Sequence, residues 1–229
     1  MSSMHKNQSG FTVLELMIST VVFSVLLLLA ASMLVQIGRL YYKGVVSSRT
    51  QETTRTITDD IGRTLQFTSE KVSVGAARTV PGAQGPVQVN AFCIGKVRYS
   101  YIINGQVNPD VNFYQPGSNS ENYVKNAMWR DENEAGPLCE PREDLPSGVQ
   151  GSNGREMLGE GMRLYRLRVP QDSNALASFA VGVVYGQDDE LIEFSGSGDS
   201  LTARCTGVGL GAQWCATSEL QTTVYRRTN

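Results

Sequence analysis

The chain has 229 residues, of which 41% are hydrophobic, and its formal net charge is -2 at pH 7. A near-neutral charge argues against a dedicated nucleic-acid-binding protein, because such proteins usually carry a clear excess of Lys and Arg. Beyond an apolar run near the N-terminus, about 190 residues remain, which is enough for one globular domain that buries its own core.

The first predicted element is an apolar helix that begins beside a carboxylate. No charged residue occurs from Leu16 to Gly38, and about 23 residues are enough for a helix to cross roughly 30 Å of hydrocarbon. Glu15 stands directly before this run. Because a charge at the edge of a membrane span costs insertion free energy, we expect a partner that compensates the charge of Glu15.

The residues around this glutamate form a distinctive pattern. The stretch GFTVLELMI resembles the processing site of type IV pilins and type II secretion pseudopilins, the class III signal family. The resemblance implies that a prepilin peptidase cuts after Gly10 and methylates the new N-terminal amine on Phe11. It further implies that Glu15, the fifth residue of the mature chain, meets the amine of a neighbouring subunit and sets the register of assembling helices.

Two other interpretations of the N-terminus are open. An ordinary secretory signal has an apolar core of about 7–15 residues, and the LLAAS stretch around Ala30 offers a cleavage site, but the apolar run continues past it. A plain single-pass anchor is the other alternative. Lys6 before the run and Arg39 and Lys43 after it give only a weak positive-inside bias. The inside placement of the leader therefore rests on the resemblance and on the cysteines.

An amphipathic helix is predicted to continue the apolar one, because no proline occurs before Pro81. Its apolar face holds Tyr42, Val46, Ile57, Ile61 and Leu65, with Thr53 filling a gap. Its polar face holds Arg49, Glu52, Arg55, Asp59 and Arg63. This pattern predicts one helix from about Thr12 to Phe67. The helix resembles the long first helix of pilins, and RTITDDIGRTLQF resembles a stretch of the larger minor pilins, although the mid-helix proline of many major pilins is missing.

After a glycine-rich loop from Gly75 to Pro86, the pattern changes to the period of two that is typical of strands. The stretch KVRYSYIINGQV places Val97, Tyr99, Tyr101 and Ile103 on one face. The Asn104-Gly105 pair that follows predicts a two-residue hairpin turn.

Two later stretches also read as strands with one apolar face. RLYRLRV places Tyr165, Leu167 and Val169 together, and ASFAVGVVYG aligns Phe179, Val181, Val183 and Tyr185. The predicted fold class is α+β, a long N-terminal helix packed on an antiparallel sheet. The predicted organisation is a leader at 1–10, a transmembrane and assembly helix at 11–38, a stalk helix at 39–68 and a pilin-like head domain at 69–229.

Four cysteines lie beyond the apolar run, without a CxxC pair, and the one histidine, His5, precedes the run. A zinc site is therefore disfavoured, and disulfides in an oxidising, extracytoplasmic compartment are favoured. Cys205 and Cys215 are near neighbours in sequence, which leaves Cys93 and Cys139 as the second pair, with other connectivities open. The Cys205–Cys215 loop also resembles the disulfide-bounded region of pilins. Cys139 is then expected to tie down the long irregular stretch from Asn108 to Gly161.

Catalytic function is disfavoured, and we expect no catalytic residue, metal or cofactor. After cleavage the mature chain has no histidine, which removes Ser-His and Cys-His nucleophiles and histidine metal sites. Asp59 and Asp60 are adjacent on a helix and are expected to face solvent. The segment from Gly186 to Glu190 is expected to be a plain turn rather than a calcium site.

Nucleic acid is a disfavoured partner. Arg163, Arg166 and Arg168 with Tyr165, and Arg226 with Arg227 at the C-terminus, combine basic and aromatic groups, but an exposed strand face explains them more simply.

The sequence therefore predicts a minor pilin, processed and N-methylated, that joins a type IV pilus, primes assembly or lies near the tip. The expected partners are prepilin peptidase, other major and minor pilins, the inner-membrane assembly machinery and, before assembly, the lipid bilayer. The expected location is the cytoplasmic membrane, with a single span and an extracytoplasmic head, and then the pilus on the cell surface. The alternatives are a type II secretion or DNA-uptake pseudopilin, or a membrane-anchored binding domain that never polymerises.

Overall fold

A computed structural model describes residues 12–82, 85–108, 123–132, 139–150, 153–169, 176–186, 191–196, 200–206 and 214–226. The predicted cleavage site at Gly10 and Phe11 lies outside these residues. The chain forms two compact units, the first ending at Tyr41 and the second comprising Tyr42–Asn229. We call the second the C-terminal unit.

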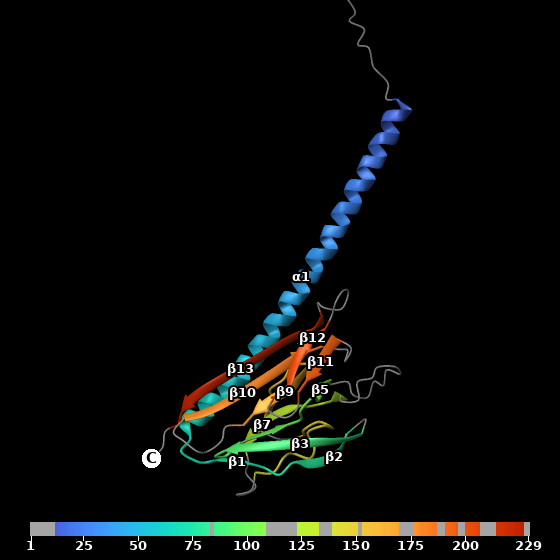
Figure 1. Cartoon of the computed structure of the whole chain (residues 1–229). Coiled ribbons are helices and arrows are strands. Elements are labelled where there is room, and N and C mark those ends of the chain that lie inside the picture. Colours follow the sequence, from blue (N-terminus) through green and yellow to red (C-terminus); the bar gives the residue numbers. More distant parts are fainter. Residues whose placement is uncertain are drawn as a thin grey trace, which may run out of the picture. The chain divides into compact units, whose positions relative to one another are not determined.

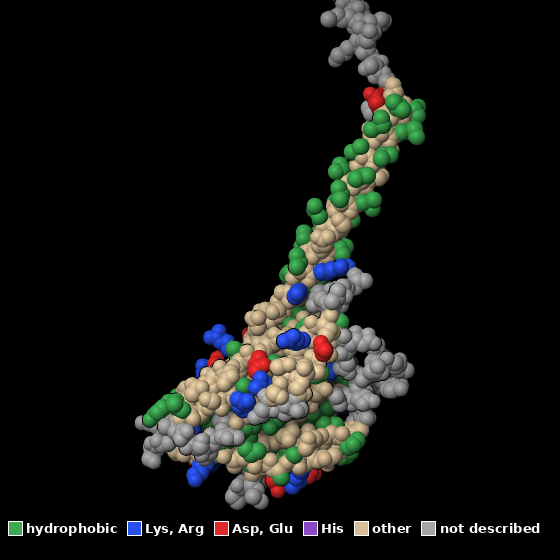
Figure 2. Space-filling model, viewed as in Figure 1, with side chains coloured by type: hydrophobic (Ala, Val, Ile, Leu, Met, Phe, Trp, Pro, Cys, Tyr) green, Lys and Arg blue, Asp and Glu red, His purple; other side chains and the backbone are tan. Residues whose placement is uncertain are grey.

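A single helix, α1, runs from Val13 to Phe67 over 55 residues (Figure 1). Its bounds agree with the predicted helix within one residue, because no proline interrupts the segment and its glycines are tolerated within a helix. Among the described residues it is the one helix long and apolar enough to span a membrane. In Figure 2 hydrophobic side chains cover its N-terminal part.

The C-terminal half of α1 has one buried face and one polar face. The buried residues are Val46, Thr50, Thr54, Ile57, Thr58, Ile61, Gly62 and Leu65. The predicted apolar face is correct at four of its positions and wrong at Tyr42, which is 50% exposed. Thr53 is only half-buried, and the gap is filled by Thr50, Thr54 and Thr58. Each of these hydroxyls donates to the carbonyl four residues earlier, at 2.7–2.9 Å.

The strands form two main sheets and a small hairpin. The first sheet has the order β1-β3-β4-β7-β8, and β2 pairs with β3 outside this path. Its strands are β1 (Val72–Val74), β2 (Arg78–Gly82), β3 (Gly85–Ile94), β4 (Val97–Tyr101), β7 (Met128–Glu132) and β8 (Arg155–Glu156). All of these pairings are antiparallel.

The second sheet has the order β13-β10-β9-β5-β6, antiparallel except for β5 with β6. Its strands are β5 (Gln106–Val107), β6 (Tyr123–Val124), β9 (Met162–Arg168), β10 (Leu176–Tyr185) and β13 (Ala216–Tyr225). The separate hairpin pairs β11 (Ile192–Ser195) with β12 (Thr202–Cys205). The structure therefore confirms the α+β class, with more strands than the sequence predicted.

One main core joins α1 to both sheets. It contains Ile57, Ile61 and Leu65 of α1 with Phe92 of the first sheet and Phe179 of the second. β10 and β13 run beside this part of α1 (Figure 1), where a β-carbon at Gly62 would lie 3.8 Å from Phe179 and from Val224. A second, smaller cluster contains Tyr165 and Val184 of the second sheet with Ile192 and Ala203 of the hairpin. The second sheet is therefore covered on both faces.

The Asn104-Gly105 turn does not close the predicted hairpin. β4 ends at Tyr101, Ile103 bridges Leu164 of β9, and β5 belongs to the second sheet. Of the two turn residues Asn104 alone has a positive φ, 61°, whereas a type I′ turn needs a positive φ at both. The turn therefore carries the chain from one sheet to the other.

The predicted face of β9 is also wrong in part. The register between β9 and β10 shifts at Gly182 and Val183, and such a bulge moves the residues that follow to the opposite face. Leu164 consequently lies in the main core, whereas Tyr165 lies in the small cluster, apart from Leu167. A β-carbon at Gly182 would lie 2.6 Å from the Tyr165 ring, so the ring lies directly over this glycine.

Two segments that were expected to be irregular contain strands. The glycine-rich segment forms the β2–β3 hairpin. Within the stretch from Asn108 to Gly161, β7 and β8 are strands of the first sheet and β6 is a strand of the second. The rest of that stretch is described only at 139–150 and around the strands.

Candidate assembly site and head-domain ion pairs

Glu15 is held by a capping box at the start of α1. The backbone N–H of Thr12 donates to Glu15 Oε2 at 3.0 Å, and the Thr12 hydroxyl donates to the same oxygen at 2.9 Å. In return the backbone N–H of Glu15 donates to Thr12 Oγ1 at 3.3 Å. This reciprocal arrangement satisfies free amides at a helix N-terminus. Thr12 and Glu15 both follow the predicted cleavage site after Gly10, so the predicted mature chain contains both residues of the capping box.

Four hydroxyl side chains of the apolar run form hydrogen bonds within the helix. The hydroxyls of Ser19, Thr20, Ser24 and Ser32 donate to carbonyls three or four residues earlier, at 2.7–2.9 Å. A hydroxyl bonded in this way is compatible with hydrocarbon, where no water replaces a missing partner. Glu15 is therefore the residue of this segment whose charge still calls for an external partner.

Asp60 joins α1 to the first sheet, contrary to its predicted solvent exposure. Its Oδ2 accepts from the Tyr99 hydroxyl at 2.7 Å and lies 2.9 Å from Arg130 Nε, while Oδ1 accepts from Arg155 Nη2 at 2.8 Å. The carboxylate is only 16% exposed. Burial raises the pKa of Tyr99, so its hydroxyl stays protonated and donates. We call this group the Asp60 cluster.

Asp59 behaves as predicted, which separates the two adjacent carboxylates. Its side chain is 59% exposed and lies 3.7 Å from Arg55. A helical-periodicity argument distinguishes them, because Asp60 is three residues after Ile57 and four before Thr64, next to the buried face. That signal was present in the sequence, but nothing in the sequence showed that two arginines and a tyrosine would meet there.

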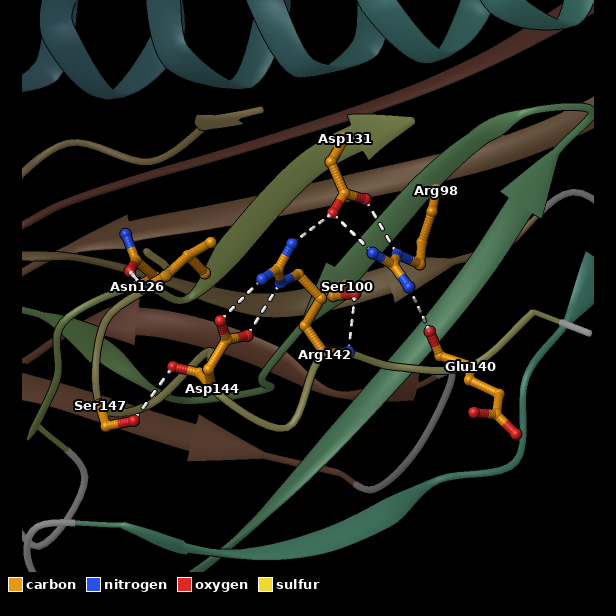
Figure 3. Close-up of polar contacts among 9 residues, drawn as sticks. Arg98, Ser100, Asn126, Asp131, Glu140, Arg142, Asp144 and Ser147 are labelled. Atoms are coloured by element: carbon orange, nitrogen blue, oxygen red, sulfur yellow. Dashed lines mark hydrogen bonds and ion pairs between the residues drawn. The ribbon is translucent and has the colours of Figure 1, made fainter. Parts of the chain in front are cut away.

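A second ion-pair cluster surrounds Asp131, which is 3% exposed (Figure 3). Arg98 donates to both carboxylate oxygens, at 2.9 and 2.6 Å, and Arg142 Nη1 donates to Oδ2 at 3.0 Å. Arg142 also contacts Asp144 through two bonds of 2.8 and 2.7 Å, and this contact lowers the pKa of Asp144. The two arginines compensate the buried charge of Asp131.

This group of Asp131, Arg98, Arg142 and Asp144, which we call the Asp131 cluster, holds the segment 139–150 against the first sheet. The backbone N–H of Arg142 donates to Ser100 Oγ at 3.1 Å, and Arg98 Nη1 donates to the Glu140 carbonyl at 3.2 Å. Arg78 of β2 also pairs with Glu140 and Glu143. A segment with this many contacts is part of the fold rather than a free loop.

Two disulfides link the chain. Cys93 of β3 bonds to Cys139, and Cys205 of β12 bonds to Cys215, with Cα–Cα distances of 5.8 and 5.7 Å. Gly75 permits the close packing beside the first bridge, because a β-carbon there would lie 2.1 Å from the Cys139 carbonyl oxygen. The first disulfide and the Asp131 cluster therefore hold the same segment, and the second fixes the hairpin to the start of β13.

Glu156 is a buried carboxylate that the sequence did not single out. Its oxygens accept from the backbone N–H groups of Ala127, Met128 and Leu158 at 2.9–3.1 Å. Burial nevertheless raises the pKa of Glu156 to about 7. It joins the end of β8 to the segment before β7, and its protonation changes near neutral pH.

Three of the arginines considered for nucleic-acid contact are engaged within the protein. Arg163 is buried and donates to Gln106 Oε1 at 2.8 Å. Arg166 pairs with Glu219 at 2.5 Å, and the hydroxyl of Tyr165 donates to the same carboxylate at 3.0 Å. Arg226 donates to the Glu70 carbonyl, and Arg227 lies outside the described residues. On β9, the guanidinium groups of Arg163 and Arg166 therefore have partners within the protein, and Arg168 is half-buried.

The described residues contain no group of three or more His, Cys, Asp or Glu side chains that could hold a metal ion. The carboxylates of the predicted turn after Gly186 lie outside the described residues.

A family model described as the prokaryotic N-terminal methylation motif matches residues 5–31. The match covers the predicted cleavage site, the capping box and the first part of α1. Comparison with curated proteins and with solved structures gave no match.

Proposed function

We propose that this chain, a type IV pilin-like protein with a class III signal, is a minor pilin that is incorporated into a type IV pilus. Prepilin peptidase removes residues 1–10 and methylates Phe11. The protein is held in the cytoplasmic membrane by the apolar part of α1, with the C-terminal unit on the extracytoplasmic side. It then joins other major and minor pilins through the inner-membrane assembly machinery. Like the larger minor pilins that it resembles, it primes assembly or lies near the tip.

The observation that carries the proposal is the methylation motif directly followed by α1, with Glu15 as the charged residue at the head of the span. Both hydrogen bonds from Thr12 go to Glu15 Oε2. These bonds orient the carboxylate but leave its charge uncompensated. An ammonium group would compensate the negative charge of Glu15, and cleavage creates such a group on Phe11 of each subunit. Pairing between subunits favours one axial register of the bundled helices.

Mass spectrometry of the mature N-terminus is the first test. We expect a chain that begins with N-methylated Phe11 when the protein is produced together with a prepilin peptidase. An intact leader would support the single-pass anchor that never polymerises, and a cut near Ala30 would support an ordinary secretory signal.

Replacing Glu15 tests the assembly role. Glu15→Ala removes the carboxylate that pairs with the incoming amine, so we expect normal membrane insertion and cleavage but at least tenfold less processed protein in sheared filaments, equivalent to about 1.4 kcal/mol. Glu52→Ala is the matched control, because Glu52 is an exposed carboxylate on the same helix. Equal incorporation of both variants would contradict an assembly role for Glu15.

A pseudopilin of a type II secretion or DNA-uptake system is the second candidate, since the motif is shared by these systems. The same co-purification experiment separates them when it is run in cells that carry one system at a time. Recovery with a secretion or uptake filament, and not with a pilus, would favour this candidate.

A further inference from the structure

Two aromatic rings from distant parts of the C-terminal unit meet at the beginning of its helical segment. The rings of Tyr42 and Trp214 have centroids 5.1 Å apart and are inclined by 42°. Tyr42 is 50% exposed and Trp214 is 40% exposed. Because both rings keep large exposed faces, the pair packs against itself and still presents apolar surface outwards.

The disulfide Cys205–Cys215 positions the tryptophan. Cys215 is the next residue after Trp214 and is buried in the small cluster beneath the hairpin. The bridge therefore fixes the backbone beside Trp214 at the start of β13. Trp214 is thus held beside Tyr42 while both rings stay partly exposed, and this fixed aromatic pair calls for an explanation.

The position of Tyr42 along the chain supplies one. Tyr42 follows Gly38, the last residue of the uncharged run, by four residues, which is about 6 Å along a helix. The polar layer on each side of a bilayer is about 5–7 Å thick. Tyr42 therefore falls at the depth of the lipid headgroups when the run lies in hydrocarbon. Tyrosine and tryptophan are enriched at this level, because each ring has an apolar body and a polar edge.

The next residue carries a charge that fits the same surroundings. Lys43 is exposed, and its long apolar stem allows the ammonium group to reach lipid phosphates. One turn after Tyr42, Val46 is already buried in the C-terminal unit. The aromatic pair thus lies where the buried face of α1 begins.

We propose that Tyr42, Lys43 and Trp214 form an interfacial anchor that seats the C-terminal unit on the outer surface of the bilayer before assembly. The partner is the headgroup layer of a phospholipid membrane, with the two rings among the glycerol and carbonyl groups and Lys43 at the phosphates. The proposal rests on membrane residence of α1 but not on incorporation into a filament.

The experiment uses the full chain in phospholipid vesicles with Trp214 as the only fluorophore. The chain has two tryptophans, so Trp129→Phe isolates Trp214, and Trp214→Phe isolates Trp129 as the matched control. The vesicles contain phosphatidylcholine brominated at a shallow or a deep position of the acyl chain, since bromine quenches only nearby rings. Flotation with the vesicles first establishes that the chain is inserted.

We expect shallow bromines to reduce the Trp214 emission by about half, deep bromines to reduce it less, and neither to reduce the Trp129 emission. If Trp129→Phe does not fold, the difference between the wild-type and Trp214→Phe spectra gives the same information. If the Lys43→Gln variant shows less quenching of Trp214 in vesicles that contain anionic lipid, Lys43 contacts the lipid phosphates. No change on that substitution would remove Lys43 from the anchor.

Three results would overturn the proposal. The first is a floating protein whose Trp214 is unaffected by either brominated lipid and remains fully open to an aqueous quencher. The second is protection of Trp214 in sheared filaments but not in vesicles, which would assign the rings to a neighbouring subunit. The third is failure to float, which would refute membrane residence itself, whereas the first two leave the proposed pilin function untouched.

Discussion

Replacing Asp60 by Asn, with Asp59→Asn as its neighbour control, tests the Asp60 cluster most directly. The substitution keeps the shape of the side chain but removes the charge that faces Arg130 and Arg155. Tyr99 loses a charged acceptor, a bond of about 1.5–3 kcal/mol, although Thr64 remains 3.0 Å away. Arg155 is 59% exposed, so its contact adds at most about 1 kcal/mol. Arg130, 30% exposed, loses its buried counter-ion. We expect the free energy of unfolding to fall by about 3 kcal/mol in total.

For a unit of this size, about 3 kcal/mol corresponds to a decrease in Tm of about 6–12 °C. The assay is thermal unfolding of the full chain in detergent, followed by near-ultraviolet circular dichroism. Asp59→Asn should change the stability by less than about 0.5 kcal/mol, because its contact is exposed. A cycle with Tyr99→Phe measures the Asp60–Tyr99 coupling, which we expect to exceed about 1 kcal/mol. Equal and small effects of both asparagine substitutions would refute the assignment of Asp60 as the link between α1 and the first sheet.

Three further predictions concern other parts of the chain. Because burial raises the pKa of Glu156 to about 7 from 4.5, the folded state keeps a proton that the unfolded chain has lost between these pH values. The free energy of unfolding should then fall by about 3 kcal/mol as pH rises through this range. Denaturation curves measured at several pH values from pH 4 to about pH 8 give this pH dependence, and Glu156→Gln should remove it. Asp131→Asn leaves Arg98 without a counter-ion, whereas Arg142 keeps Asp144, so we expect a cost of about 3 kcal/mol. Trypsin should then cut after Arg142 faster than in the wild type, and an unchanged cleavage rate would contradict the role of the Asp131 cluster. Gly10→Val should block processing, so a mutant that migrates as the shorter mature form on a gel would show that cleavage occurs elsewhere.

Local periodicity was sufficient to predict the helix but not the sheets. The bounds of α1 follow from its composition, because the signal is carried by residues three and four apart in the same segment. The face of β9, in contrast, depends on a bulge at Tyr165, the β9 residue that has no partner where β10 passes from Gly182 to Val183. No pattern within RLYRLRV contains that information.

The same limit applies to the site residues. The positions of Thr12 and Glu15 match the three-residue spacing of a capping box, so their contact could have been predicted from the sequence. Asp131 and Glu156 could not, because their partners come from segments up to 33 residues away. A buried carboxylate is recognisable only when the cations or amides that surround it are known.

The three buried threonines of α1 have a mechanical consequence. The hydroxyls of Thr50, Thr54 and Thr58 donate hydrogen bonds to carbonyls of their own helix. At these three positions α1 therefore packs on its neighbours through van der Waals contact. The directional contacts from α1 to the first sheet are concentrated in one turn, at Asp60 and Thr64. A pulling force along the helix axis is then resisted by the packing of the buried face of α1 and by the hydrogen bonds and ion pairs at that turn. The contacts of Asp60 with Tyr99, Arg130 and Arg155 therefore raise the force that is needed to slide α1 along the first sheet.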